Sequence, residues 1–184
     1  MNTLPPAREV SRFLFGSEPH RILAVLDGAS VPGLAQAMQA YKVEHECLYR
    51  GELGADLVAT APYVARCEPE HPFTEWLLNE GWGRHWGIFA ALPRGLAMRE
   101  IRKHFRTFLM VKDPEGRTLY FRYYDPRVMR VYLPSCNATE MKTVFGPALS
   151  YIMEDEGAQV LVRIVPGGSK PKVEKIELAR TLAV

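Results

Sequence analysis

Hydrophobic positions along the chain repeat with two different periods, which predict strands in some segments and helices in others. Short apolar runs at residues 21–26 and 85–92 are typical of strands buried inside a sheet. Residues 94–106 have the clearest helical pattern, because Ala97, Ile101 and Phe105 recur every four residues. Strands and helices alternate along the chain. This predicts an α/β protein of the α+β type, with helices packed on a mixed sheet that contains antiparallel hairpins.

Turn and capping residues place most of the remaining elements. Two hairpins are expected, one around the DPEG turn at 113–116 and one around Glu156-Gly157. Asn137 and Glu140 have the spacing of a capping box, which predicts a helix that ends near Gly146. The same reasoning predicts helices over 31–41, after Ser30 as N-cap, and over 72–79, and strands over 45–49 and 62–67.

The pattern indicates one main domain with two short extensions. Residues 1–20 lack clear periodicity and are expected to form an N-terminal arm that can hold one short helix. The domain itself is expected to span 21–165. After Pro166 the composition shifts to glycine, lysine and proline, so 166–184 is predicted to be a linker and C-terminal tail without a large second lobe.

Composition narrows the functional classes. The 184 residues are 47% hydrophobic and carry a formal net charge of +2, too small for bulk electrostatics to suggest nucleic-acid binding. Three widely spaced cysteines favour a reducing compartment. There is no signal-peptide pattern and no apolar run of membrane-spanning length, so we expect a cytoplasmic protein without membrane contact.

The densest segment is FRYYDPRV at 121–128, with three aromatic residues and two arginines. Its first half continues an alternating pattern that is typical of a strand. Asp125 is a preferred helix N-cap and Pro126 fits the first helical position, so the segment predicts a strand followed by a capped helix. Arg127 is expected to lie close to the capping carboxylate.

Candidate chemistry is sparse. No histidine or cysteine spacing predicts a metal site, no nucleophile motif predicts a catalytic serine, and no phosphate-binding loop predicts a cofactor. Asp27 and Asp125 both follow predicted strands and could form an acid–base pair with a histidine, as in a small hydrolase or transferase. Because Arg122 and Arg127 are nearby in sequence, a structural carboxylate–arginine network is the favoured interpretation.

A second cluster, GWGRHWGI at 81–88, has two possible roles. Trp82 and Arg84 could form a binding platform, since tryptophan and arginine are frequent in interaction hot spots. Trp86 is expected to start a core strand. On the 94–106 helix, the arginines are predicted to form a solvated face, and His104 is predicted to pair with Glu100 four residues earlier.

Together these motifs resemble a known family. VLDGA at 25–29, CLYRG at 47–51, APYV at 61–64, GWGRHWGI and FRYYDPRV follow one another in the order typical of the effector adaptor (chaperone) domain of bacterial type VI secretion systems. The resemblance covers about residues 21–147. Many members continue into a variable helical lobe that has no counterpart in the roughly twenty residues after Val165.

The resemblance implies a protein that is not an enzyme, uses no cofactor and recognises other proteins. Its expected partners are a type VI effector and the VgrG spike protein onto which the effector is loaded. The residues assigned to partner binding are Trp82, Arg84, Arg122, Tyr124 and Arg127, and those assigned to architecture are Asp27, Asp125, Pro126 and Trp86.

Overall fold

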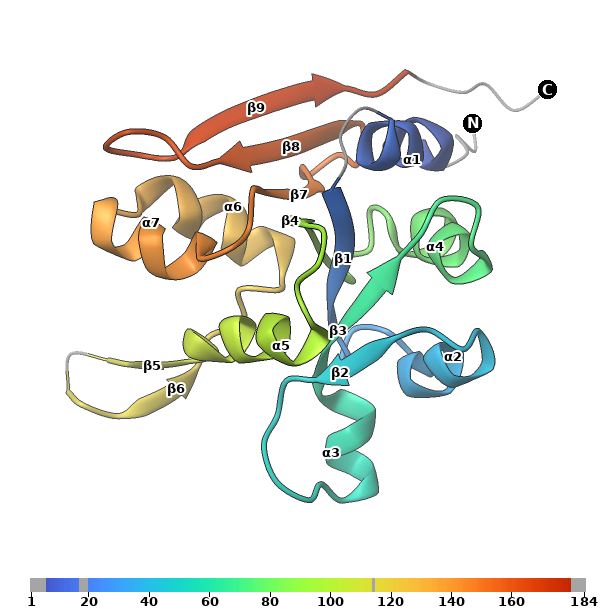
Figure 1. Cartoon of the computed structure of the whole chain (residues 1–184), viewed down its shortest axis with the longest axis horizontal. Helices are drawn as coiled ribbons and strands as arrows, with labels where there is room; N and C mark the ends of the chain where they lie inside the picture. The colour runs from blue at the N-terminus through green and yellow to red at the C-terminus, as the bar shows by residue number, and fades with distance from the viewer. Residues whose placement is uncertain (1–5, 17–19, 114, 180–184) are drawn as a thin grey trace.

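Seven strands form one antiparallel sheet with helices on both faces (Figure 1). A computed structural model describes residues 6–16, 20–113 and 115–179. The strands of the sheet lie in the order β2-β3-β1-β4-β7-β8-β9. Their bounds are β1 His20–Asp27, β2 His45–Cys47, β3 Pro62–Cys67, β4 Gly87–Pro93, β7 Ser150–Glu154, β8 Val160–Val165 and β9 Lys172–Glu177. The predicted α+β class is confirmed, and every strand pairing in the described sheet is antiparallel, without the parallel pairs that a mixed sheet includes.

The apolar run of the first strand reflects burial on both sides. Along β1, Leu23 and Val25 face one hydrophobic core, whereas Ile22, Ala24 and Leu26 face the other. A strand that alternates between two cores needs apolar residues at every position, which is why residues 21–26 show no polar alternation.

Six helices cover the two faces. On the first face, α5 (Met98–Thr107), α6 (Pro126–Ser135) and α7 (Ala138–Phe145) pack against the sheet. On the second face lie α1 (Ala7–Phe15), α2 (Leu34–Ala40) and α4 (Pro72–Trp76), the last continued by a π-helical turn, η1 (Leu77–Gly81). A seventh helix, α3 (Ala55–Thr60), buries none of its residues.

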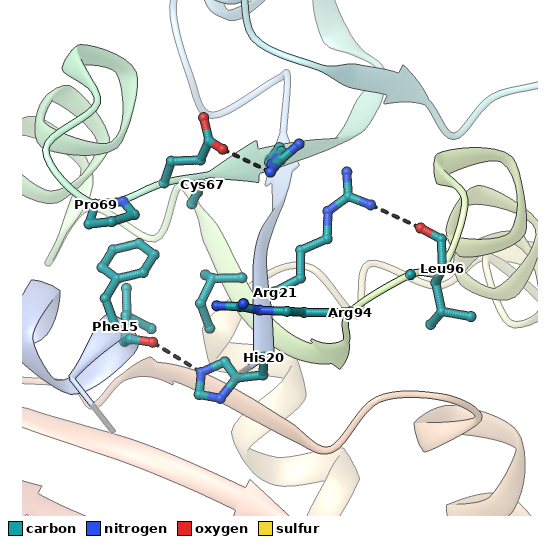
Figure 2. A pocket seen from close by; sticks show the side chains of 12 residues that line it. Phe15, His20, Arg21, Cys67, Pro69, Arg94 and Leu96 are labelled. Atoms are coloured by element: carbon teal, nitrogen blue, oxygen red, sulfur yellow. Dashed lines mark hydrogen bonds and ion pairs between the residues drawn. The ribbon is translucent and has the colours of Figure 1, made fainter. Parts of the chain in front are cut away.

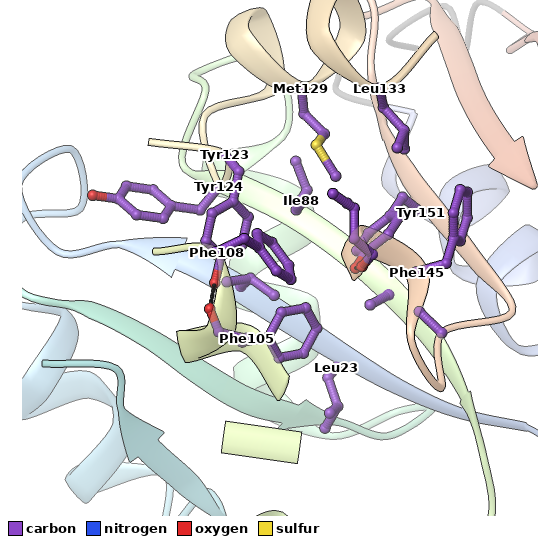
Figure 3. Packing of buried hydrophobic residues seen from close by; sticks show 14 of the residues in the cluster. Leu23, Ile88, Phe105, Phe108, Tyr123, Tyr124, Met129, Leu133, Phe145 and Tyr151 are labelled. Carbon is purple, nitrogen blue, oxygen red and sulfur yellow. Dashed lines mark hydrogen bonds between the residues drawn. The ribbon is translucent and has the colours of Figure 1, made fainter. Parts of the chain in front are cut away.

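The first core is rich in aromatic rings (Figure 3). Tyr123 is fully buried and donates its hydroxyl to the Phe105 carbonyl at 2.8 Å, and Tyr151 donates to the Val144 carbonyl at 2.6 Å. These bonds matter because a buried hydroxyl without a partner would destabilise the fold. Burial raises the pKa of both phenols well above the ordinary value, so they stay neutral donors.

The N-terminal arm holds one short helix, as predicted, whereas the C-terminal extension is more ordered than predicted. In the arm, α1 buries Val10 and Leu14 completely against the second face of the sheet. The prediction of a linker and tail is wrong for residues 172–177, which form β9 and pair with β8. An edge strand of alternating charges such as KVEKIE resembles a solvated tail in sequence, and only pairing reveals it.

Two local predictions are also wrong. Ser30 does not cap a helix: α2 begins at Leu34, and the Ser30 hydroxyl donates to Asp27 at 2.7 Å. His104 does not pair with Glu100, whose carboxylate instead accepts from the Ala97 backbone N–H. The His104 ring is largely buried against Phe105 and Phe108, and burial lowers its pKa to about 4.

Candidate functional site

The segments that carry the sequence motifs meet at the end of β1. Asp27 is the last residue of this strand, and its carboxylate is only 2% exposed. It accepts hydrogen bonds from the Ala29 backbone N–H at 3.1 Å, the Ser30 hydroxyl at 2.7 Å and the Arg122 guanidinium at 2.5 Å. A buried carboxylate with three donors is a well-satisfied charge, and it ties the VLDGA segment to FRYYDPRV, 95 residues away.

Asp125 forms the second half of this network. It caps α6 by accepting from the Arg127 backbone N–H at 2.9 Å, as predicted, with Pro126 at the first helical position. The Arg127 guanidinium also donates to the Asp125 carboxylate, at 2.7 Å and 3.0 Å. The Arg122 guanidinium lies 4.0 Å from the same carboxylate. The favoured carboxylate–arginine network is therefore present, with Arg122 bonded to Asp27 and close to Asp125.

Electrostatics agree with this geometry. Burial alone would raise the pKa of Asp125, but the hydrogen bonds from Arg127 outweigh it and lower that pKa below its ordinary value. Burial likewise opposes the charge on Arg122, and the carboxylate of Asp27 overcomes this effect and raises the pKa of the guanidinium. The charges on Arg122 and Asp125 are therefore stabilised in their ionised forms.

The CLYRG segment, residues 47–51, is held in place by two arginines of α5. Arg102 of α5 donates to the Cys47 carbonyl at 2.8 Å, and Arg106 donates to the carbonyls of Leu48 and Tyr49. The prediction of a solvated arginine face is wrong for these two side chains, because they fasten the loop after β2 to α5. Helical spacing alone gave no signal for this role.

A glycine explains why two of the motifs lie so close together. A Cβ atom on Gly28 would lie 2.3 Å from the Ala61 carbonyl oxygen, which accepts the Gly28 N–H at 3.1 Å. Only glycine permits this approach of backbone to backbone. VLDGA and APYV are thus adjacent in space through a contact that no side chain mediates.

The GWGRHWGI segment forms a structural turn beside the end of β1, where the Trp86 carbonyl accepts the Asp27 backbone N–H at 2.9 Å. Glu154, at the end of β7, is buried and accepts the backbone N–H groups of Gly83 at 2.5 Å and His85 at 2.8 Å. Burial raises the pKa of this carboxyl, although the two N–H donors oppose the shift. Sequence reasoning missed Glu154, because it lies about seventy residues away from the turn.

The five residues assigned to partner binding divide into two groups. Arg84, Arg122 and Arg127 are between about half and two-thirds exposed, so their outer faces are open. Trp82 and Tyr124 are buried, which corrects the expectation that they offer contact surface. The Trp82 indole N–H donates to the Ala158 carbonyl at 2.8 Å. Trp86 is buried, as predicted.

The exposed apolar surface lies next to the network, on a hairpin. Strands β5 (Met110–Lys112) and β6 (Thr118–Tyr120) pair only with each other within the described sheets and project from the body of the molecule (Figure 1). The ring of Tyr120 lies 5.1 Å from that of Tyr49, centroid to centroid. The hairpin carries four large hydrophobic side chains that are 38–57% exposed, namely Met110, Val111, Leu119 and Tyr120.

The arrangement favours structure over acid–base chemistry at the two aspartates. Asp27 and Asp125 do come together, as the hydrolase or transferase alternative requires. However, both carboxylates are occupied by arginine and backbone donors, and no histidine hydrogen-bonds to either of them in the part of the chain that the structure describes. Within the same residues, no group of three or more histidine, cysteine or acidic side chains could hold a metal ion.

Comparison with known proteins assigns the chain to a family. Residues 22–143 match the model of a family described as "Domain of unknown function (DUF4123)". The chain belongs to this family. The matched range contains the whole Asp27–Arg122–Asp125–Arg127 network and the β5–β6 hairpin, whereas α1 and β7–β9 lie outside it. No curated protein and no solved structure matches the chain.

Proposed function

We propose that this DUF4123 protein is a non-enzymatic adaptor that binds a type VI secretion effector in the cytoplasm and loads it onto a VgrG-type spike. The observation that carries the proposal is the exposed hydrophobic β5–β6 hairpin, which projects beside the network of paired charges. The order of motifs shared with the effector adaptors supplies the identity of the partners. Among the described residues no helix has the length and apolarity needed to cross a membrane.

The hairpin has the properties of a protein-binding element. Strand pairing places Met110 opposite Tyr120 and Val111 opposite Leu119, so that apolar side chains occur on both faces. Methionine and tyrosine are enriched in interfaces, and clustered exposed apolar residues mark interaction sites more often than isolated ones do. The free edges of a two-stranded sheet can also accept a partner strand.

The base of the hairpin is fixed, which favours specific recognition. The Phe121 N–H donates to the Leu109 carbonyl at 2.9 Å, and the next residues enter the buried core at Tyr123. Arg122 then anchors the chain to Asp27. A surface held by a rigid base loses little conformational entropy when it binds, and this increases affinity.

Co-purification tests the proposal with two separate partners: a cognate VgrG-type spike protein and a candidate type VI effector. We expect the wild-type chain to retain at least one of them. We also expect the double variant Leu119→Ser/Tyr120→Ser to weaken that binding about tenfold or more, since interface hot spots contribute at this level.

The matched control is Val173→Ser, which replaces a similarly exposed side chain on β9, outside the hairpin. This variant should bind like the wild type. If the wild type binds neither partner, the adaptor function is wrong. If the hairpin variant binds as tightly as the control, the hairpin is not the contact surface.

A further inference from the structure

A cleft lies at the opposite end of β1 from the Asp27 network. It encloses about 590 Å³, within the range typical of small-ligand sites. Figure 2 shows Phe15 and Pro69 on one side, Arg21 and Leu96 on the other, and Arg94 with His20 between them. Residues from α1, β1, the end of β3 and the loop after β4 therefore contribute to a single opening.

Arg21 is a fixed cation in the wall of this cleft. Its guanidinium donates to the Leu96 carbonyl at 3.0 Å and to the Glu44 carboxylate at 2.6 Å, and its side chain is only 14% exposed. Its Nε–H is buried and has no hydrogen-bond partner in the described structure. An orphaned buried donor of this kind is costly, and because this N–H is inaccessible, Arg21 contributes its positive charge to the cleft rather than this hydrogen bond.

Arg94 adds an open cation beside Arg21, and His20 adds a ring held in one orientation. Arg94 is exposed and forms neither an ion pair nor a hydrogen bond with any described side chain. His20 Nε2 lies 3.1 Å from the Leu14 carbonyl, which can only accept, so this nitrogen carries the proton and the ring is held in place.

The balance of charges favours a monoanion. The cleft and its immediate partners contain three arginines, Arg21, Arg66 and Arg94, against the two carboxylates Glu44 and Glu68. Arg66 contacts both carboxylates, and Arg21 contacts Glu44. One positive charge remains in excess, on Arg94, which suits one carboxylate group better than a doubly charged phosphate.

The other wall is apolar. Phe15 and Pro69 line it, so a ligand that places its charge on the arginines would bury a hydrophobic body against them. We infer that this cleft binds a carboxylate carried on an apolar body, either the C-terminus of a peptide that ends in hydrophobic residues or a small free acid. The site does not depend on the adaptor function, because it shares no residue with the hairpin.

Calorimetric titration of the full chain tests this inference with three probes: acetyl-Leu-Phe with a free carboxylate, the same peptide as its amide, and benzoate. We expect saturable binding of at least one acid, and binding of the acidic peptide about tenfold tighter than that of the amide if the peptide C-terminus is the ligand. Binding of benzoate as tightly as the peptide would assign the site to small acids. Shifts in the His20 ring signals by NMR would place the ligand in the cleft.

Arg94→Gln should weaken binding of the preferred acid about tenfold, because it removes a charge-assisted bond without disturbing a packed residue. Arg50→Gln is the matched control: it neutralises an exposed arginine outside the cleft and should leave affinity unchanged. The inference is overturned if no acid binds saturably, if amide and acid bind equally, or if Arg94→Gln binds like the wild type.

Discussion

Charged side chains lie at both ends of β1, but the two ends differ in how completely these charges are paired. At the Asp27 end, each carboxylate is buried and each arginine of the network pairs with one of them. At the His20 end, Arg21 keeps an unsatisfied Nε–H and Arg94 has no partner among the described side chains. The first cluster is complete within the described protein, whereas the second retains cationic groups without a described partner.

The contrast separates architecture from recognition. A fully paired network orders the chain around it but leaves few donors for a partner. Groups with unused hydrogen bonds, or apolar side chains left in water, are the ones that gain by binding. By this criterion FRYYDPRV mainly supports the domain, while the β5–β6 hairpin and the cleft are the surfaces available to partners.

Asp27→Ala should have the largest effect. The substitution removes three hydrogen bonds and leaves the Arg122 guanidinium without its closest partner, so we expect the free energy of unfolding to fall by about 2–3 kcal/mol. Urea denaturation measures this free energy, and Glu156→Ala, a substitution at an exposed position, is the control. A loss below about 1 kcal/mol would show that the network does not hold the domain together.

Asp125→Asn should have a smaller, pH-dependent effect. Asparagine keeps the helix cap but loses the charge that Arg127 stabilises, which should cost about 1 kcal/mol at pH 7. The pKa of Asp125 is lowered by folding, so its ionic contribution is present above the unfolded-state pKa of about 4 and is lost as pH falls through the folded-state value.

The measurement is the difference in unfolding free energy between the wild type and Asp125→Asn at pH 7 and at pH 3. This difference cancels the titration of the other acidic groups and should shrink at the lower pH. A difference that stays constant or grows on acidification would mean that the carboxylate–arginine pair does not stabilise the fold.

Arg94→Gln should have the smallest effect on stability. Because Arg94 is exposed and contacts no described partner, we expect a change within about 0.5 kcal/mol in the same denaturation experiment. A loss comparable to that of Asp27→Ala would abolish the distinction between the two ends of β1, since Arg94 would then be a structural residue.

Most helices and strands were predictable because their hydrophobic patterns and capping residues agree with the positions that these segments take in the fold. The apolar run at 21–26 became β1, and the Asn137–Glu140 capping box opens α7 as predicted. The helix predicted over 94–106 begins only at Met98, which leaves Arg94 free to enter the cleft. β9 was missed because a charged edge strand depends on its neighbour for its structure.

The candidate site was predictable only in part. Asp125 and Arg127 are two residues apart, so capping rules alone predicted their contact. The bond between Asp27 and Arg122 spans 95 residues, and the sequence favoured a carboxylate–arginine network without predicting this pair. Alternation along 121–124 placed Tyr123 and Tyr124 on opposite sides, but β6 ends at Tyr120 and both tyrosines turn into the interior.

By itself, the sequence determined the α+β class, most strand and helix positions and the family resemblance, because these depend on periodicity and short-range capping. The tertiary structure alone decided which charges are paired, which aromatic rings are buried and where unused donors remain. Those properties depend on contacts between distant segments, and a residue's exposure is set by its neighbours in space. The exposed apolar surface of the hairpin and the Arg94 cleft therefore became visible only after the chain was folded.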